Sequence, residues 1–71
     1  MTISQIKFGD ILLNKTNAGN EVLIVTAVSS DVTRYGASYI TTEVIKSPLY
    51  SKGKEKVFTK FGLLQGIEKI A

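Results

Sequence analysis

The chain is 71 residues long, contains no cysteine and no histidine, and carries a formal net charge of +3. This length suits one domain, so residues 1–71 are expected to fold as a single unit. The missing residue types exclude a disulfide and argue against metal binding and catalysis, because histidine and cysteine are common metal ligands and common groups for acid–base and nucleophilic chemistry. We therefore predict a protein that is not an enzyme and binds no cofactor or metal.

The beginning of the chain does not resemble an export signal. Residues 1–7 lack a charged start followed by a long apolar run. The longest unbroken apolar run, at residues 22–25, is far too short to cross a bilayer. We expect a cytoplasmic protein with no membrane partner.

Short runs of β-branched and aliphatic residues, separated by turn residues, predict five strands. The predicted strands cover residues 10–16, 21–29, 37–46, 55–60 and 66–70. The sequence Asn17-Ala18-Gly19-Asn20 predicts a hairpin between the first two strands, because glycine adopts the left-handed conformation that a short turn requires. Residues 30–36 form a polar connection with room for one helical turn, and Pro48 and Gly53 mark a loop over residues 47–54.

The C-terminal segment fits two patterns. Helical spacing relates four aliphatic residues: Leu63, Leu64, Ile67 and Ile70. Two glycines, Gly62 and Gly66, oppose a helix, since each costs roughly 1 kcal/mol in a helix interior. We therefore prefer a tight turn over residues 61–64 followed by a short last strand.

The second predicted strand is apolar on both faces, which is typical of a central strand or of one covered on both sides. One face carries Val22, Ile24, Thr26 and Val28, and the other carries Leu23, Val25 and Ala27. We assign the first of these faces to the core. The residues predicted to be mainly buried are Ile11, Leu13, Val22, Ile24, Val28, Ile40, Val44, Leu64 and Ile67. A thin barrel has limited means to cover both faces, so we also hypothesise a homodimer.

The order of these elements resembles the SH3-like barrel over about residues 6–70. Two segments carry the resemblance. Phe8-Gly9-Asp10-Ile11-Leu12 opens the first strand, and Phe61-Gly62-Leu63-Leu64 precedes the last one. The resemblance is architectural, and it implies a mostly β protein: a small five-stranded antiparallel barrel with at most one short helical turn.

Positive charge is concentrated between residues 46 and 60, where five lysines accompany a single acid. The rest of the chain has four basic and five acidic residues. A basic segment on a near-neutral body favours an anionic partner, either nucleic acid or an acidic protein surface. The alternative is that these lysines solubilise a loop and protect a sheet edge. The five are Lys46, Lys52, Lys54, Lys56 and Lys60.

Phe58 alternates with Lys56 and Lys60 along a predicted strand, so the three side chains share one face. If that face lies outside, the ring is placed to stack on a base while the two ammonium groups meet phosphates. If it lies inside, Phe58 belongs to the core and the lysine heads reach water at the ends of the barrel. The sequence leaves both interpretations open.

Tyr50 lies in one long connection, and Arg34 and Tyr35 lie in the other. Tyrosine combines a large contact area with a polar tip, so each ring is a candidate binding anchor, and the alternative is that each covers a barrel mouth. Two functions follow. The first is a non-catalytic module whose basic surface contacts nucleic acid. The second is a small protein-interaction factor, of the kind encoded by phages or mobile elements, that docks on a host or partner protein and modulates it.

Overall fold

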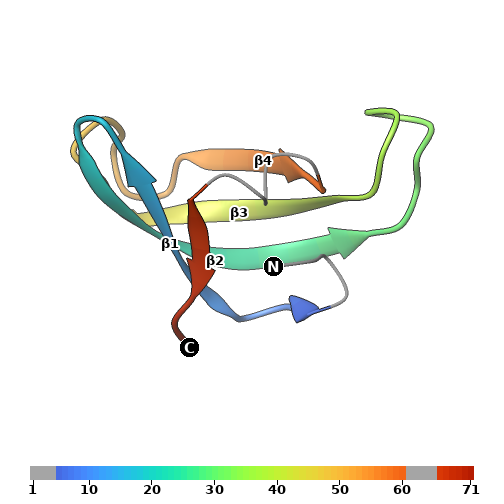
Figure 1. The fold of residues 1–71 in the computed structure, drawn as a ribbon, viewed down its shortest axis with the longest axis horizontal. Helices are drawn as coiled ribbons and strands as arrows, with labels where there is room; N and C mark the ends of the chain where they lie inside the picture. The colour runs from blue at the N-terminus through green and yellow to red at the C-terminus, as the bar shows by residue number, and fades with distance from the viewer. Residues whose placement is uncertain (1–4, 61–65) are drawn as a thin grey trace.

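The fold is that of a computed structural model in which residues 5–60 and 66–71 are described (Figure 1). These residues contain five strands, each within two residues of its predicted bounds. They are β1 (Ile11–Thr16), β2 (Gly19–Ser29), β3 (Tyr39–Lys46), β4 (Glu55–Thr59) and β5 (Ile67–Lys69). The mostly β class is confirmed, and the C-terminal segment contains a strand, as preferred over a helix. The turn predicted over residues 61–64 lies outside the described residues.

All strand pairs are antiparallel and belong to one sheet, in the order β4-β3-β2-β1-β5. The first four strands follow one another as neighbours, and β5 returns to lie beside β1 (Figure 1). The described strands leave β4 and β5 at the two edges, so the sheet is open and the predicted barrel is not closed by strand pairing. In the same residues, no helix has the length and apolar character needed to cross a membrane.

The hairpin between β1 and β2 forms where the turn residues predict it. Thr16 pairs with Gly19, and Gly19 has a φ of +129°, a conformation that favours glycine. A side chain at this position would also approach Pro48, whose Cγ lies 3.4 Å from the place a Cβ would occupy. The backbone conformation is therefore what favours glycine at this turn, and the loop after β3 lies close beside it.

One face of the sheet, called the inner face below, is buried. Its core cluster consists of Ile6, Leu12, Leu23, Val25, Ile40, Val44 and Ile67, with Phe58 packed against it. Of the predicted core residues, Ile40, Val44 and Ile67 are confirmed as buried. Leu64 lies outside the described residues.

The predicted core face of the first two strands is wrong. Leu12 and Leu23 are fully buried, while the intermediate exposure of four neighbours places them on the opposite, outer face: Ile11, Leu13, Val22 and Ile24. Val28 lies beyond a β-bulge and is 41% exposed. Side chains along β2 alternate between two faces, and both faces are apolar. The alternation therefore does not show which face is buried. The buried face is the one that carries Leu23, and Glu21 is buried on the same side, where its carboxylate has hydrogen-bond partners.

This assignment predicts different consequences for two adjacent residues of β2. Leu23→Ala removes a fully buried side chain and should lower the free energy of unfolding by about 2–5 kcal/mol. Ile24→Ala removes a half-buried side chain from the outer face and should cost less, below about 2 kcal/mol. Urea unfolding followed by circular dichroism measures both. An Ile24→Ala variant less stable than Leu23→Ala would contradict the assignment of the faces.

Candidate binding surface

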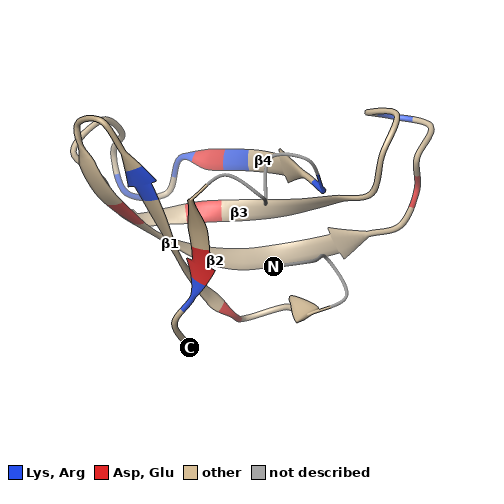
Figure 2. Ribbon diagram, viewed as in Figure 1, with Lys and Arg blue, Asp and Glu red and all other residues tan. Residues whose placement is uncertain are grey.

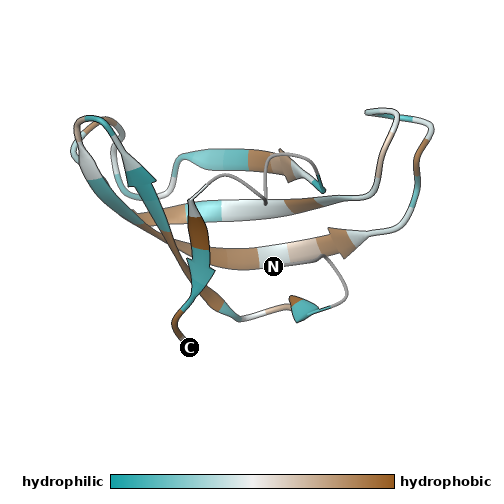
Figure 3. Cartoon of the chain, in the orientation of Figure 1, coloured by the Kyte–Doolittle hydropathy of each residue, from teal (hydrophilic) through white to brown (hydrophobic). Residues whose placement is uncertain are grey.

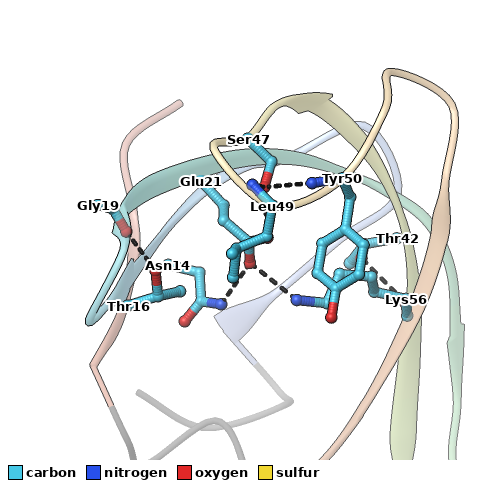
Figure 4. Close-up of polar contacts among 9 residues, drawn as sticks. All are labelled: Asn14, Thr16, Gly19, Glu21, Thr42, Ser47, Leu49, Tyr50 and Lys56. Atoms are coloured by element: carbon cyan, nitrogen blue, oxygen red, sulfur yellow. Dashed lines mark hydrogen bonds and ion pairs between the residues drawn. The ribbon is translucent and has the colours of Figure 1, made fainter.

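A buried carboxylate lies at the start of β2, close to the hairpin. Glu21 is fully buried and pairs across the strands with Asn14 of β1. Asn14 Nδ2 donates to Glu21 Oε1 over 2.7 Å, and Lys56 Nζ donates to the same oxygen over 2.8 Å. Ser47 Oγ donates to Oε2 over 2.8 Å. Both oxygens therefore have donors, and the carboxylate joins β1, β2, β4 and the segment that follows β3 (Figure 4).

Two opposing effects act on the pKa of Glu21. Burial raises it, because a charged carboxylate loses its hydration. Hydrogen bonds from Lys56, Ser47 and Asn14, together with the charge of Lys56, lower it and outweigh burial, so the pKa lies below its ordinary value. Glu21 is thus charged at neutral pH, and Lys56 serves as its cation.

The same network shapes the loop between β3 and β4. Ser47 Oγ accepts hydrogen bonds from the backbone N–H of Leu49, at 3.0 Å, and of Tyr50, at 3.2 Å. These bonds turn the chain after β3 so that the Tyr50 ring lies against Lys56, whose Nζ is 4.7 Å from the ring centroid. Lys54 Nζ lies 6.0 Å from the same centroid. Glu21 of β2 therefore acts through Ser47 on the backbone of the loop that carries the Tyr50 ring.

We call the exposed part of this loop and its margin the loop surface, which consists of Lys46, Pro48, Leu49, Tyr50, Lys52 and Lys54. Tyr50 is 41% exposed and Leu49 is 55% exposed. The three lysines are exposed and make no ion pair within the described part of the chain. The loop surface therefore combines an apolar and aromatic centre with three available positive charges.

Two of the predicted contact residues have other roles. Phe58 is opposite Ile40 and packs against the core, which decides between the two sequence interpretations in favour of the inner face. Lys56 shares that face, as the alternation predicts, but its ammonium group is bound to Glu21 and its side chain is only 21% exposed. The proposed stacking of a base on Phe58, with Lys56 beside it on an exposed strand face, therefore does not fit this arrangement.

The remaining predicted contact residues lie at the opposite end of the sheet. Tyr35 makes an edge-to-face contact with Tyr39, with ring centroids 4.8 Å apart, and the Arg34 guanidinium lies 5.5 Å from the Tyr35 centroid. Lys60 follows β4, and its backbone N–H bonds to the carbonyl of Ser38 over 2.9 Å. The connection between β2 and β3 and the loop surface occupy opposite ends of the long axis (Figure 1). The predicted residues thus form two separate surfaces.

The described residues contain no group of three or more side chains able to hold a metal ion. Comparisons with protein-family models, curated proteins and solved structures find no match for this chain.

The buried network is the feature that the sequence interpretation missed, although the hairpin contained a signal for it. A two-residue turn at Asn17-Ala18 places Asn14 directly opposite Glu21. A glutamate facing an asparagine next to aliphatic residues is an unusual pair, since a buried charge requires partners. Lys56 and Ser47 come from more distant parts of the chain, and no local pattern indicates them.

The lowered pKa of Glu21 predicts a pH dependence of stability. Because its pKa is lower in the folded state than in the unfolded chain, its contribution is fully present above the ordinary glutamate pKa, about 4.3. That contribution is lost as pH falls through the lower folded pKa. Glu21→Gln should therefore lower the free energy of unfolding near pH 7 and flatten its decline on acidification. Urea unfolding between pH 7 and pH 2 provides the measurement.

Two other acids, the partly buried Asp10 and the exposed Asp31, set the baseline for this experiment. Asp10 and Asp31 also have lowered pKa values, chiefly through backbone hydrogen bonds from Lys7 and Thr33 respectively. The Glu21→Gln variant should keep the part of the acid dependence that they supply. An acid profile identical to that of the parent would show that Glu21 contributes nothing to it.

Proposed function

We propose that this protein is a non-catalytic binding module and that its loop surface contacts single-stranded nucleic acid. The observation that carries the proposal is the position of Tyr50. Its ring is partly exposed, lies against two lysine ammonium groups, and belongs to a surface with three lysines that have no acidic partner among the described residues. Such a ring offers a face or edge to a base, while the lysines attract phosphates.

The charge available for phosphates is smaller than the five lysines of the basic segment. Lys56 is neutralised by Glu21, and Lys60 lies at the far end of β4. Lys46, Lys52 and Lys54 remain, so about three phosphates are expected to be contacted. Three contacts of this kind support weak binding that depends on salt and shows little sequence preference.

A specific observation favours a second candidate function, a protein-interaction factor that docks on an acidic protein surface. Leu49 is 55% exposed beside Tyr50 and Pro48, and exposed aliphatic and aromatic groups together are typical of protein interfaces. Binding of this kind would change less with salt than binding to phosphates. We also propose an SH3-like assignment and a cytoplasmic location, supported by the strand order and by the sequence respectively.

The nucleic-acid proposal predicts the salt dependence of binding to a labelled single-stranded oligonucleotide. With about three phosphates and about 0.7 per phosphate, the slope of log affinity against log salt should be about −2. Tyr50→Ala should weaken binding by about 1–3 kcal/mol if the ring stacks on a base. Changing Lys46, Lys52 and Lys54 together to glutamine should remove most of the binding. Fluorescence anisotropy measures each affinity.

Tyr35→Ala is the matched control, since Tyr35 is equally exposed at the other end of the sheet. It should leave the affinity unchanged, and circular dichroism should first show that every variant is folded. Absence of oligonucleotide binding by the parent at low salt would reject the nucleic-acid proposal. An equal loss in Tyr35→Ala and Tyr50→Ala would reject the assignment to the loop surface.

A further inference from the structure

The outer face of the sheet contains a row of residues that changes from apolar to acidic. Ile11 of β1 pairs with Ile24 of β2, and Ile24 pairs with Glu43 of β3. Glu43 in turn pairs with Glu55 of β4. Paired residues on neighbouring strands project from the same face. The row therefore crosses four strands, with two aliphatic side chains at one end and two carboxylates at the other.

The two carboxylates lie directly opposite each other without compensation. Both side chains are exposed, and neither forms a hydrogen bond or ion pair within the described residues. The corresponding acidic segments of β3 and β4 are neighbours in Figure 2. Like charges opposite each other destabilise a sheet. Glu68, another acid of this face, differs because it pairs with Lys15 over 3.3 Å.

The aliphatic part of the outer face also extends beyond this row. Leu13 and Val22 form the next pair of β1 and β2, and Val57 of β4 is 37% exposed. Hydrophobic colour follows much of β2 (Figure 3). Among the described strands, extensive contacts join only neighbours within the sheet, so no second layer of strands covers this face.

We propose that the outer face docks a basic amphipathic segment of another protein. Aliphatic side chains of the partner would lie on Ile11 and Ile24, and a lysine or arginine would lie between Glu43 and Glu55. The partner's cation would supply the compensation that the two carboxylates lack, and its aliphatic side chains would cover the apolar part of the row. Charge complementarity therefore selects the occupant, and it excludes nucleic acid from this face.

A second copy of the chain fits the same face less well. Its outer face would bring another Glu43 and Glu55, while Lys15 is already paired with Glu68. Among the described strands, Lys46 lies at the margin of this face, opposite Val22, and forms no ion pair that would compensate two carboxylates. Burying two such faces would leave unpaired acids, which is costly.

The test uses two synthetic peptides, one of leucine and lysine in a helical amphipathic pattern and a twin with glutamate at every lysine position. The ¹⁵N-labelled protein is titrated with each peptide and followed by NMR. The lysine peptide should shift the backbone amide signals of Ile11, Ile24, Glu43 and Glu55, and the glutamate twin should not. Equal binding of both peptides, or shifts confined to the loop surface, would overturn the proposal.

Two variants distinguish the effect of the unpaired acids Glu43 and Glu55 from the effect of any negative charge on the outer face. Changing Glu43 and Glu55 together to glutamine should weaken binding of the lysine peptide about fivefold to tenfold, as expected for two exposed ion pairs. Glu68→Gln also removes a negative charge from the outer face, but Glu68 is already paired with Lys15. This variant should change the affinity less than about twofold. Equal effects in the two variants would overturn the proposal.

Stability and self-association provide the remaining controls. Because Glu43 and Glu55 repel each other, replacing both should leave the thermal midpoint unchanged or raise it, so weaker peptide binding cannot come from unfolding. Oligonucleotide binding at the loop surface should also stay unchanged, which separates this proposal from the proposed function. Dimerisation in sedimentation equilibrium that is abolished by Ile24→Asp would identify a second copy as the occupant and overturn the proposal.

Discussion

A buried carboxylate with a donor on each oxygen organises this small sheet. Glu21 brings together a side chain of β1, a lysine of β4 and the serine that begins the loop after β3. Unpaired, it would be among the most costly groups in the molecule, because a buried charge without partners loses its hydration and gains nothing. Its burial therefore requires Lys56 of β4 and Ser47 of the loop to be in place as its partners. In a chain of 71 residues without cysteine, such a requirement links distant strands.

The network also divides the lysines according to what they can do. Lys56 is partly buried and bound to Glu21, although the sequence groups it with the basic segment. Lys46, Lys52 and Lys54 are exposed, and Lys54 lies near the Tyr50 ring, whose backbone N–H is held by Ser47. The outer face has the opposite character, because its acids Glu43 and Glu55 lie opposite each other and form no ion pair within the described residues. One small sheet thus offers a basic loop and an acidic, apolar face to partners of different chemistry.

Turn chemistry and strand-forming residues were sufficient to predict all five strands, since Gly19, Pro48 and Gly53 mark the ends of clear aliphatic runs. They were insufficient to identify the buried face of β2, because Leu23 and Ile24 are equally good core residues and strand periodicity does not distinguish them. The candidate site was predicted in part. Tyr50 lies near Lys54 and belongs to the same segment of chain as Lys46 and Lys52, but Arg34 and Tyr35 lie at the opposite end of the sheet. That separation is set by strand length and connection order, which composition does not indicate.

The role of Glu21 in this sheet depends on its pairing with Lys56, and a double-mutant cycle tests this pairing most directly. Glu21→Gln, Lys56→Met and the double variant are compared with the parent by urea unfolding at pH 7, with Lys54→Met as an exposed control. Each single change at the pair should cost several kcal/mol, about 3 for loss of one partner of a buried ion pair. The double variant should then be more stable than the sum of the two losses implies, with a coupling energy of about 1.5–3 kcal/mol. Additivity to within about 0.5 kcal/mol would contradict the account.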